Sequence, residues 1–136
     1  MNEREARYRD KINFVTEKIE SIPTTNLEDD IIRDAVFYKI HVGIEGIVDL
    51  AAMLVKDSGK DVGDDYYNLG LLKRTGIISE EMCEKLKKLN GLRNIIVHRY
   101  NRIEEDLIFN NLDKIKKDIY DFIKVIEDVI KNHRFE

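Results

Sequence analysis

The chain has 136 residues, a length that suits one domain whose core needs neither disulfides nor metals. Hydrophobic residues make up 43% and charged residues 37%, which is typical of a soluble, helix-rich protein, and the net charge of −4 argues against a general nucleic-acid binder. A single cysteine, a charged N-terminus and the lack of a long apolar run exclude a disulfide scaffold, a secretory signal and a membrane span, so we predict one cytoplasmic domain over residues 1–136.

The first half of the chain predicts two helices and a loop. Apolar residues recur at steps of four and three over residues 8–22, the pattern of an amphipathic helix, and a proline follows directly. Thr25 and Glu28 have the spacing of a capping box, which predicts a long second helix over residues 26–55. The glycines and small polar residues of 56–64 favour a loop.

The second half predicts one short helix and two long ones. Residues 65–75 read as a short helix that ends at Gly76, and Ser79 is placed as the N-cap of the fourth helix. The fifth helix is predicted from apolar residues at helical spacing over 108–129. No strand pattern or internal repeat is found, so we expect an all-α bundle of four long helices and one short helix.

The end of the fourth helix gathers side chains with chemical potential. On an ideal helix its apolar residues share one side, formed by Leu86, Leu89, Leu92 and Ile96. His98 falls nearly opposite that side, close to Asn94, and is predicted to face solvent or another chain. Arg93 and Tyr100 lie within about 20° of each other, at the border of the apolar side. A surface pair of His98 and Asn94 and an arginine that bridges a carboxylate would be the plain structural reading.

Charge is unevenly distributed around this segment. Residues 73–102 hold eight basic and three acidic side chains, which gives +5 there and leaves −9 for the rest of the chain. Such a local basic surface could hold a phosphate backbone, and on charge alone it could equally be a solvated lysine face.

These residues resemble a known family. Arg93, His98 and Tyr100 match the R-x4-H-x-Y motif of HepT-like toxins, which belong to the larger HEPN group of ribonucleases. The start of the long second helix and the approach to the motif are also similar to that family, in Arg33-Asp34-Ala35-Val36, Gly76-Ile77-Ile78-Ser79 and Leu89-Asn90-Gly91-Leu92. The similarity extends over roughly residues 5–130 and implies a HEPN-like fold.

The resemblance also implies a function and partners. A HepT-like chain would be a homodimer in which both motifs line one cleft and RNA is cleaved without a metal or other cofactor. Its partner would be a minimal nucleotidyltransferase antitoxin, which transfers AMP to the motif tyrosine in a type VII toxin–antitoxin pair. In this chain the resemblance makes Arg93 and His98 catalytic, Asn94 supporting, and Tyr100 the AMP-modified residue.

The residue types suit metal-free RNA cleavage by the 2′-hydroxyl of the substrate. The imidazole of a histidine takes both protonation states near neutrality, so we assign acid/base chemistry to His98. The guanidinium of an arginine stays charged and can hold two phosphate oxygens, so we assign Arg93 as the phosphate clamp, with Asn94 orienting one of them. If two chains contribute, one His98 acts as base and the other as acid. AMP on Tyr100 would occupy the place of substrate beside Arg93.

A second polar stripe follows the long second helix. Asp34, Tyr38, His41 and Glu45 recur at steps of four, three and four and share one face. This stripe could line the cleft or pair across the dimer, although a solvated face is the favoured reading. His41 and Glu45 have metal-ligand spacing, but no third ligand is evident, so we reject a metal site.

Two other functions stay open. The motif could bind a nucleotide, or dock the nucleotidyltransferase, without catalysis, and the chain could be a purely structural dimerising bundle. The sequence contains no glycine-rich phosphate loop and no serine or cysteine nucleophile arrangement, which argues against an ATPase and a serine-type hydrolase.

Overall fold

Six helices make up the described part of the chain, which is residues 2–98 and 102–132 of a computed structural model. They are α1 (Glu3–Glu20), α2 (Asp30–Asp57), α3 (Asp65–Arg74), α4 (Glu80–Val97), α5 (Arg102–Asn110) and α6 (Leu112–Lys131). These residues contain no strand, so the prediction of an all-α fold is confirmed. None of the described helices has the length and apolar character needed to span a membrane.

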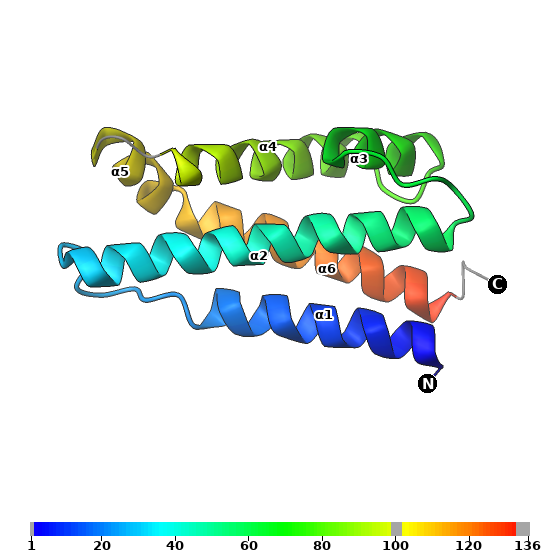
Figure 1. The fold of residues 1–136 in the computed structure, drawn as a ribbon, viewed down its shortest axis with the longest axis horizontal. Coiled ribbons are helices and arrows are strands. Elements are labelled where there is room, and N and C mark those ends of the chain that lie inside the picture. Colours follow the sequence, from blue (N-terminus) through cyan, green and yellow to red (C-terminus); the bar gives the residue numbers. More distant parts are fainter. Residues whose placement is uncertain (1, 99–101, 133–136) are drawn as a thin grey trace.

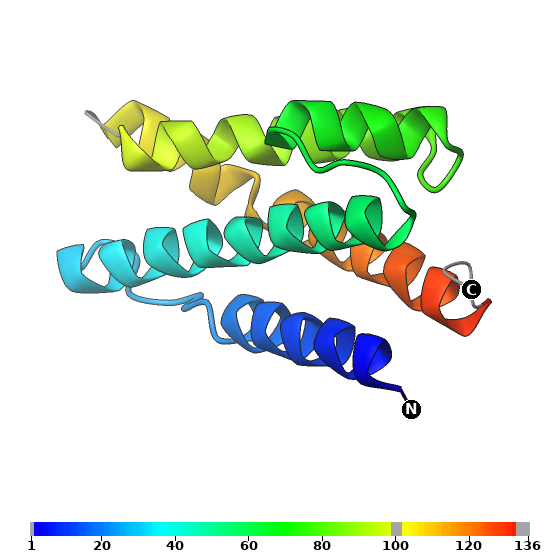
Figure 2. The same cartoon turned by 45° about the vertical axis from the view of Figure 1, so that its right-hand side comes forward.

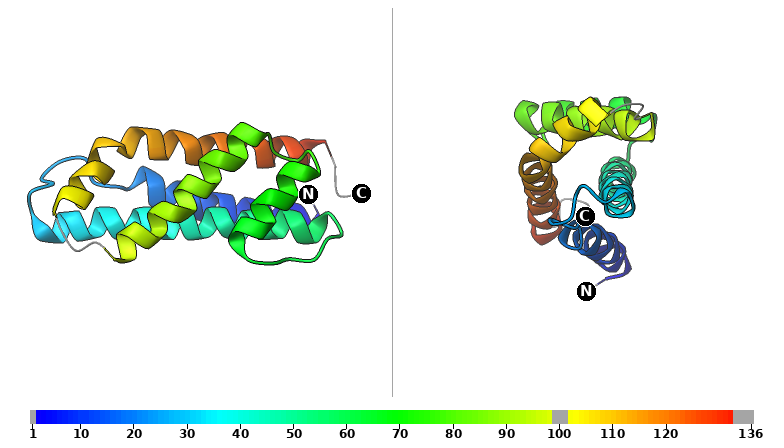
Figure 3. Two further views of the ribbon diagram at one scale, coloured as in Figure 1. Left: turned by 90° about the horizontal axis from the view of Figure 1, so that it is seen from above. Right: turned by 90° about the vertical axis from the view of Figure 1, so that its left-hand side faces the viewer.

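The helices are stacked in layers around one core. α2 and α6 lie side by side in the middle, α1 packs against them on one side, and α3 and α4 lie across the other (Figures 1 and 3). α5 leads from the α4 layer back to α6, and Figure 2 shows the same layers obliquely. Buried aliphatic and aromatic side chains from all six helices form one continuous cluster, so the apolar stripes predicted from the sequence meet in a shared core.

α1 approaches α2 closely because α2 carries glycines where the two helices cross. A Cβ atom at Gly46 would lie 2.3 Å from Cγ2 of Val15, and one at Gly43 would lie 2.6 Å from Cδ1 of Ile19. Val15 and Ile19 are both fully buried in this contact. The missing side chains therefore create the space that α1 fills.

The start of α2 differs from its prediction. The sequence pattern placed the helix at residue 26 with a capping box from Thr25, whereas α2 begins at Asp30 and its N-cap is Asp29. Asn26 adopts a left-handed backbone conformation, with φ at 61°, and a turn separates it from the helix. The carboxylate of Asp29 then accepts hydrogen bonds from the backbone N–H groups of Ile31 and Ile32.

α3 and α4 follow their predictions closely. α3 ends one residue before the predicted terminus, and Gly76 beyond it has a φ of 79°, which a residue without a side chain adopts easily. Ser79 is the N-cap of α4, and its hydroxyl oxygen accepts a hydrogen bond of 3.0 Å from the N–H of Met82. The apolar side of α4 is buried as expected, including Leu86, Leu89 and Ile96.

The predicted fifth helix is wrong as a single element, because the chain breaks at Asn111 into α5 and α6. The N–H of Asn111 donates to the carbonyl of Ile108, three residues back, instead of to Leu107. The side-chain amide of Asn111 donates to that Leu107 carbonyl at 2.7 Å in its place. An asparagine that satisfies the carbonyl left unpaired can thus end one helix and begin the next.

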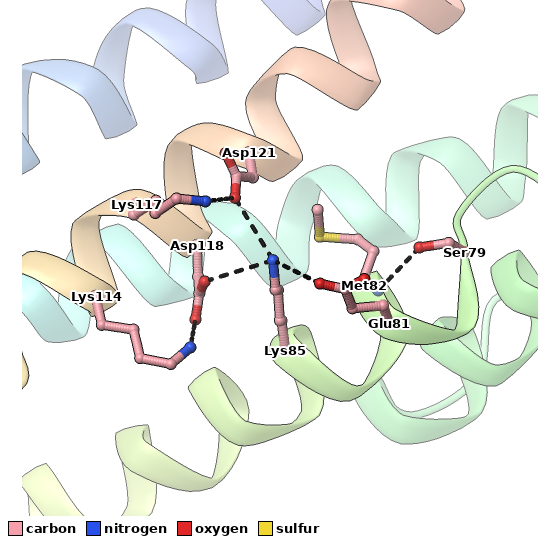
Figure 4. A network of polar contacts seen from close by, with 8 residues as sticks. All are labelled: Ser79, Glu81, Met82, Lys85, Lys114, Lys117, Asp118 and Asp121. Carbon is pink, nitrogen blue, oxygen red and sulfur yellow. Dashed lines mark hydrogen bonds and ion pairs between the residues drawn. The ribbon is translucent and has the colours of Figure 1, made fainter.

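Ion pairs join α4 to α6 at the edge of the core. The Lys85 ammonium on α4 lies 3.6 Å from Asp121 and 4.0 Å from Asp118 of α6 (Figure 4). Each of these carboxylates also accepts a hydrogen bond from a lysine one turn earlier on α6, Lys114 for Asp118 and Lys117 for Asp121. Asp118 is buried, so its partners compensate a charge removed from water. The network therefore holds the N-terminal half of α4 against α6.

Candidate active site

Arg93 lies in the C-terminal half of α4, where α2 and α3 meet that helix. Its Nη1 donates a hydrogen bond of 2.8 Å to Oε1 of Glu45 on α2. Its Nη2 donates a second one, also of 2.8 Å, to Oδ2 of Asp65, the first residue of α3. The side chain is only 19% exposed. Arg93 therefore sits at the border of the core, as helical geometry predicts, but it is held by two carboxylates from different helices.

His98 lies just past the end of α4 and forms its C-cap. Its backbone N–H donates to the carbonyl of Asn94 at 3.1 Å, which completes the last helical turn. The side chains of both His98 and Asn94 are exposed. The position predicted for His98, away from the apolar side of the helix, is confirmed, so its imidazole is not sealed in the core.

The polar stripe of α2 runs along the same side of the molecule as the end of α4. Asp34, Tyr38 and His41 line a hollow of about 280 Å³ together with residues 96 and 97 of α4. Glu45, one turn further on, contacts Arg93. Two members of this stripe therefore lie against the motif-bearing helix: Glu45 binds Arg93, and the partly exposed His41 lines the hollow. That the stripe lines a cleft or pairs across a dimer stays a prediction.

His41 connects to the Arg93 contacts through Glu45. Its Nε2 lies 3.7 Å from the same carboxylate oxygen that accepts from Arg93. Its Nδ1 is buried and makes no hydrogen bond within the described residues. The order in space is thus an imidazole, a carboxylate, a guanidinium and a second carboxylate, contributed by His41, Glu45, Arg93 and Asp65.

Neither Asp65 nor the contact between Glu45 and Arg93 could be predicted from the sequence. Their hydrogen bonds to Arg93 span 28 and 48 residues of chain, so no local pattern reveals them. The one sequence signal was the helical spacing that put Glu45 on the polar stripe of α2. Tyr100 and Arg99 lie outside the described residues, and the predicted closeness of Tyr100 to Arg93 stays a prediction.

Another hollow of about 510 Å³ lies between α4 and the α5–α6 pair. Its lining includes neither Arg93 nor His98 and is largely apolar, with Leu89, Leu92 and Leu107 among its residues. Among the described residues, no group of three histidine, cysteine, aspartate or glutamate side chains is placed to bind one metal ion.

The arrangement is a helical bundle that presents an exposed imidazole at a helix end and a guanidinium in a polar cradle nearby. A family model described as Ribonuclease HepT-like matches residues 9–126 of the chain. A protein of Archaeoglobus fulgidus named "Putative RNase" is 44% identical over 128 residues, which covers 94% of this chain and 96% of that protein. The chain therefore belongs to the HepT-like ribonuclease family.

Further relatives agree with this family. The mRNA nuclease HepT of Shewanella oneidensis is 26% identical over 101 residues, which covers 74% of this chain and 76% of that protein. The fold is also that of a solved structure of the tri-AMPylated Shewanella oneidensis HEPN toxin in complex with MNT antitoxin. That likeness has a TM-score of 0.77 at 23% identity and covers 94% of this chain and 99% of the solved chain.

Proposed function

We propose that this chain is a metal-independent endoribonuclease toxin in which Arg93 and His98 carry out RNA cleavage. The observation that carries the proposal is the position of His98, exposed at the end of α4 and five residues beyond Arg93, in a chain of the HepT-like ribonuclease family. An imidazole in that position is open to substrate.

The reaction assigned to this site uses the 2′-hydroxyl of RNA as the nucleophile. His98 moves a proton to or from a reacting oxygen, a role that imidazole side chains commonly take in general acid–base catalysis. Arg93 stabilises the negative charge that builds up on the phosphate oxygens in the transition state. Asn94, exposed one turn before His98, orients one of these groups.

Arg93 keeps donors for a phosphate although two carboxylates bind it. A guanidinium has five N–H donors, and the hydrogen bonds to Glu45 and Asp65 use one on each terminal nitrogen. The N–H on Nε and the second hydrogens of both terminal nitrogens have no hydrogen-bond acceptor within the described residues. The cation can thus be held from one side and meet a phosphate from another.

The proposal includes two protein partners. A second copy of the chain would bring a second His98 to a shared cleft, so that one imidazole acts as base while the other acts as acid. A minimal nucleotidyltransferase antitoxin would transfer AMP from ATP to Tyr100 and block the site. Support for this partner comes from the Shewanella oneidensis toxin, which is described as tri-AMPylated and in complex with MNT antitoxin.

The first test is RNA cleavage by the purified chain in the presence of EDTA. We expect the wild-type protein to cut RNA, and Arg93→Ala and His98→Ala to lose this activity while keeping the helical circular dichroism spectrum. Lys60→Ala, in the loop between α2 and α3, serves as the control that should cut normally. Undiminished cleavage by His98→Ala would refute the assignment. Nucleotide binding without cleavage by the wild type would favour the non-catalytic alternative.

The second test is intact-mass analysis after incubation with the antitoxin and ATP. We expect AMP adducts on the wild-type chain and on Tyr120→Phe, which changes an exposed tyrosine of α6. Tyr100→Phe should gain none at that position and should stay active as a nuclease. Equal addition of AMP to Tyr100→Phe would refute the modification site. Sedimentation equilibrium of the same samples tests the dimer.

A further inference from the structure

Arg93 joins three helices through ion pairs. It comes from α4, Glu45 comes from α2 and Asp65 comes from α3, and both hydrogen bonds are 2.8 Å long. The side chain of Arg93 is 19% exposed, whereas those of Glu45 and Asp65 are 45% and 33% exposed. The two carboxylates are thus more exposed than the cation that they bind, and they are not themselves part of the core.

The two contacts restrain the guanidinium in complementary ways. Each carboxylate binds a different terminal nitrogen, so together they fix both the position and the plane of the group. One contact alone would leave the plane free to rotate about a single hydrogen bond. Glu45 is in turn placed beside Nε2 of His41, at 3.7 Å, which limits its own freedom.

We propose that Glu45 and Asp65 are the positioning residues of the RNA-cleaving site, which act by holding Arg93 ready for the phosphate. This inference rests on the proposed nuclease function. An arginine that stabilises a transition state must be oriented before the substrate arrives, because a flexible one loses most of its advantage on ordering. The guanidinium here is oriented by two carboxylates of the protein itself.

A competing explanation makes opposite predictions for the kinetics. Two carboxylates around one cation give a local charge of −1, so they could instead block Arg93 and have to leave before RNA binds. Removal of a competitor lowers KM without reducing kcat, whereas removal of a positioning group reduces kcat. The two roles are thus separated by a KM-against-kcat comparison.

The experiment measures RNA cleavage kinetics of Glu45→Ala, Glu45→Gln, Asp65→Ala and Asp65→Asn. We expect kcat to fall at least about tenfold in the two alanine variants, with KM within about threefold of wild type. The amide variants should recover part of the loss, because an amide oxygen still accepts from the guanidinium. Asp49→Asn is the matched control, since Asp49 lies one turn after Glu45 on α2 but pairs with Lys11 of α1.

A second readout does not depend on cleavage. The side-chain Nε–H signal of Arg93 in ¹⁵N NMR, assigned by its loss in Arg93→Lys, should report a rigid group in the wild type and a mobile one in Glu45→Ala and Asp65→Ala. Circular dichroism and thermal unfolding verify that each variant folds. If an alanine variant does not fold, the amide variant at the same position is measured in its place.

The possible results distinguish a failure of this inference from a failure of the proposed nuclease function. The inference is overturned if the wild type cleaves RNA and the variants keep its kcat, if they lower KM at unchanged kcat, or if Asp49→Asn loses as much activity. A wild-type protein that cleaves no RNA contradicts the proposed function instead. In that case a rigid Arg93 signal that is lost in the variants would still show that the two carboxylates hold the guanidinium, and an unchanged signal would contradict the inference separately.

Discussion

The hydroxyl of Tyr8 donates a hydrogen bond of 2.7 Å to Oδ2 of Asp57, which ties α1 to the last residue of α2. Tyr8 is fully buried, and the side chain of Asp57 is 9% exposed, so neither group can easily replace this bond with water. We expect Tyr8→Phe to lower the free energy of unfolding by about 1–2 kcal/mol, because a buried carboxylate oxygen loses its donor. Urea unfolding at pH 7 measures the change. Tyr120→Phe, at an exposed tyrosine, should be close to neutral.

The same pair of residues should make the stability of the folded protein fall at alkaline pH. Burial raises the pKa of Tyr8 far above its ordinary value, and the hydrogen bond to Asp57 and its negative charge raise it further. Since the folded protein holds this proton more tightly than the unfolded chain, the stabilisation is complete below about pH 10 and is lost as pH rises beyond it. The stability difference between wild type and Tyr8→Phe should therefore narrow above pH 10. A constant difference up to pH 11 would contradict the argument.

Substitution of two helical glycines by alanine should change the stability of the protein in opposite directions. We expect Gly46→Ala to destabilise the protein by about 1–3 kcal/mol, because its Cβ would lie 2.3 Å from Val15 and would push α1 away from α2. Gly91→Ala meets nothing closer than the Tyr66 hydroxyl at 3.8 Å, so the better helix propensity of alanine should add up to about 1 kcal/mol. Thermal unfolding of both variants tests the pair. A stabilised Gly46→Ala would show that α1 is not packed as described.

Arg33 is a buried cation that joins α2 to α5. Its Nε and Nη2 donate to one oxygen of Glu105 at 3.0 and 2.8 Å, and its guanidinium carbon lies 4.4 Å from the centre of the Phe109 ring. We expect Arg33→Ala to cost about 3 kcal/mol, because it removes a buried guanidinium that binds the partly buried carboxylate of Glu105. Arg33→Lys should recover only part of that loss, because an ammonium lacks the planar fork.

The control for Arg33 is an exposed ion pair. Arg9 and Glu127 are 3.4 Å apart with both side chains at least 40% exposed, so Arg9→Ala should cost less than about 1 kcal/mol. Chemical denaturation compares the two arginines. Equal losses would mean that burial of Arg33 does not decide its contribution.

Asp121 should make the stability of the folded protein fall at acidic pH. The hydrogen bond from Lys117 lowers the pKa of Asp121, and the charges of Lys117 and Lys85 contribute. Because the folded-state pKa is below the unfolded one, the stabilisation is present above about pH 4 and is lost as pH falls further. Asp121→Asn should unfold with a shallower pH dependence between pH 5 and pH 3, measured by urea midpoints. Asp128→Asn, at an exposed carboxylate of the same helix, should keep the wild-type dependence.

Several helix boundaries and the exposure of His98 could be predicted because both depend on local rules. The 3.6-residue period assigns a side of α4 to each residue whatever α4 packs against, and the cap at Ser79 and the glycine at position 76 act within a few residues. α2 begins later than the Thr25 capping box predicts, because the backbone of Asn26 is left-handed and the carboxylate of Asp29 caps the helix instead. The break at Asn111 was missed because the apolar spacing continues across it.

The residues themselves determined an all-helical chain of the HepT-like kind, with an arginine at the edge of the core and an imidazole facing outward. Only the tertiary structure decided what surrounds that arginine. Glu45, Asp65 and His41 reach it from helices that are distant in sequence, and their meeting depends on how closely α2, α3 and α4 pack. Periodicity is a property of one helix, whereas an ion pair between helices depends on the path of the whole chain.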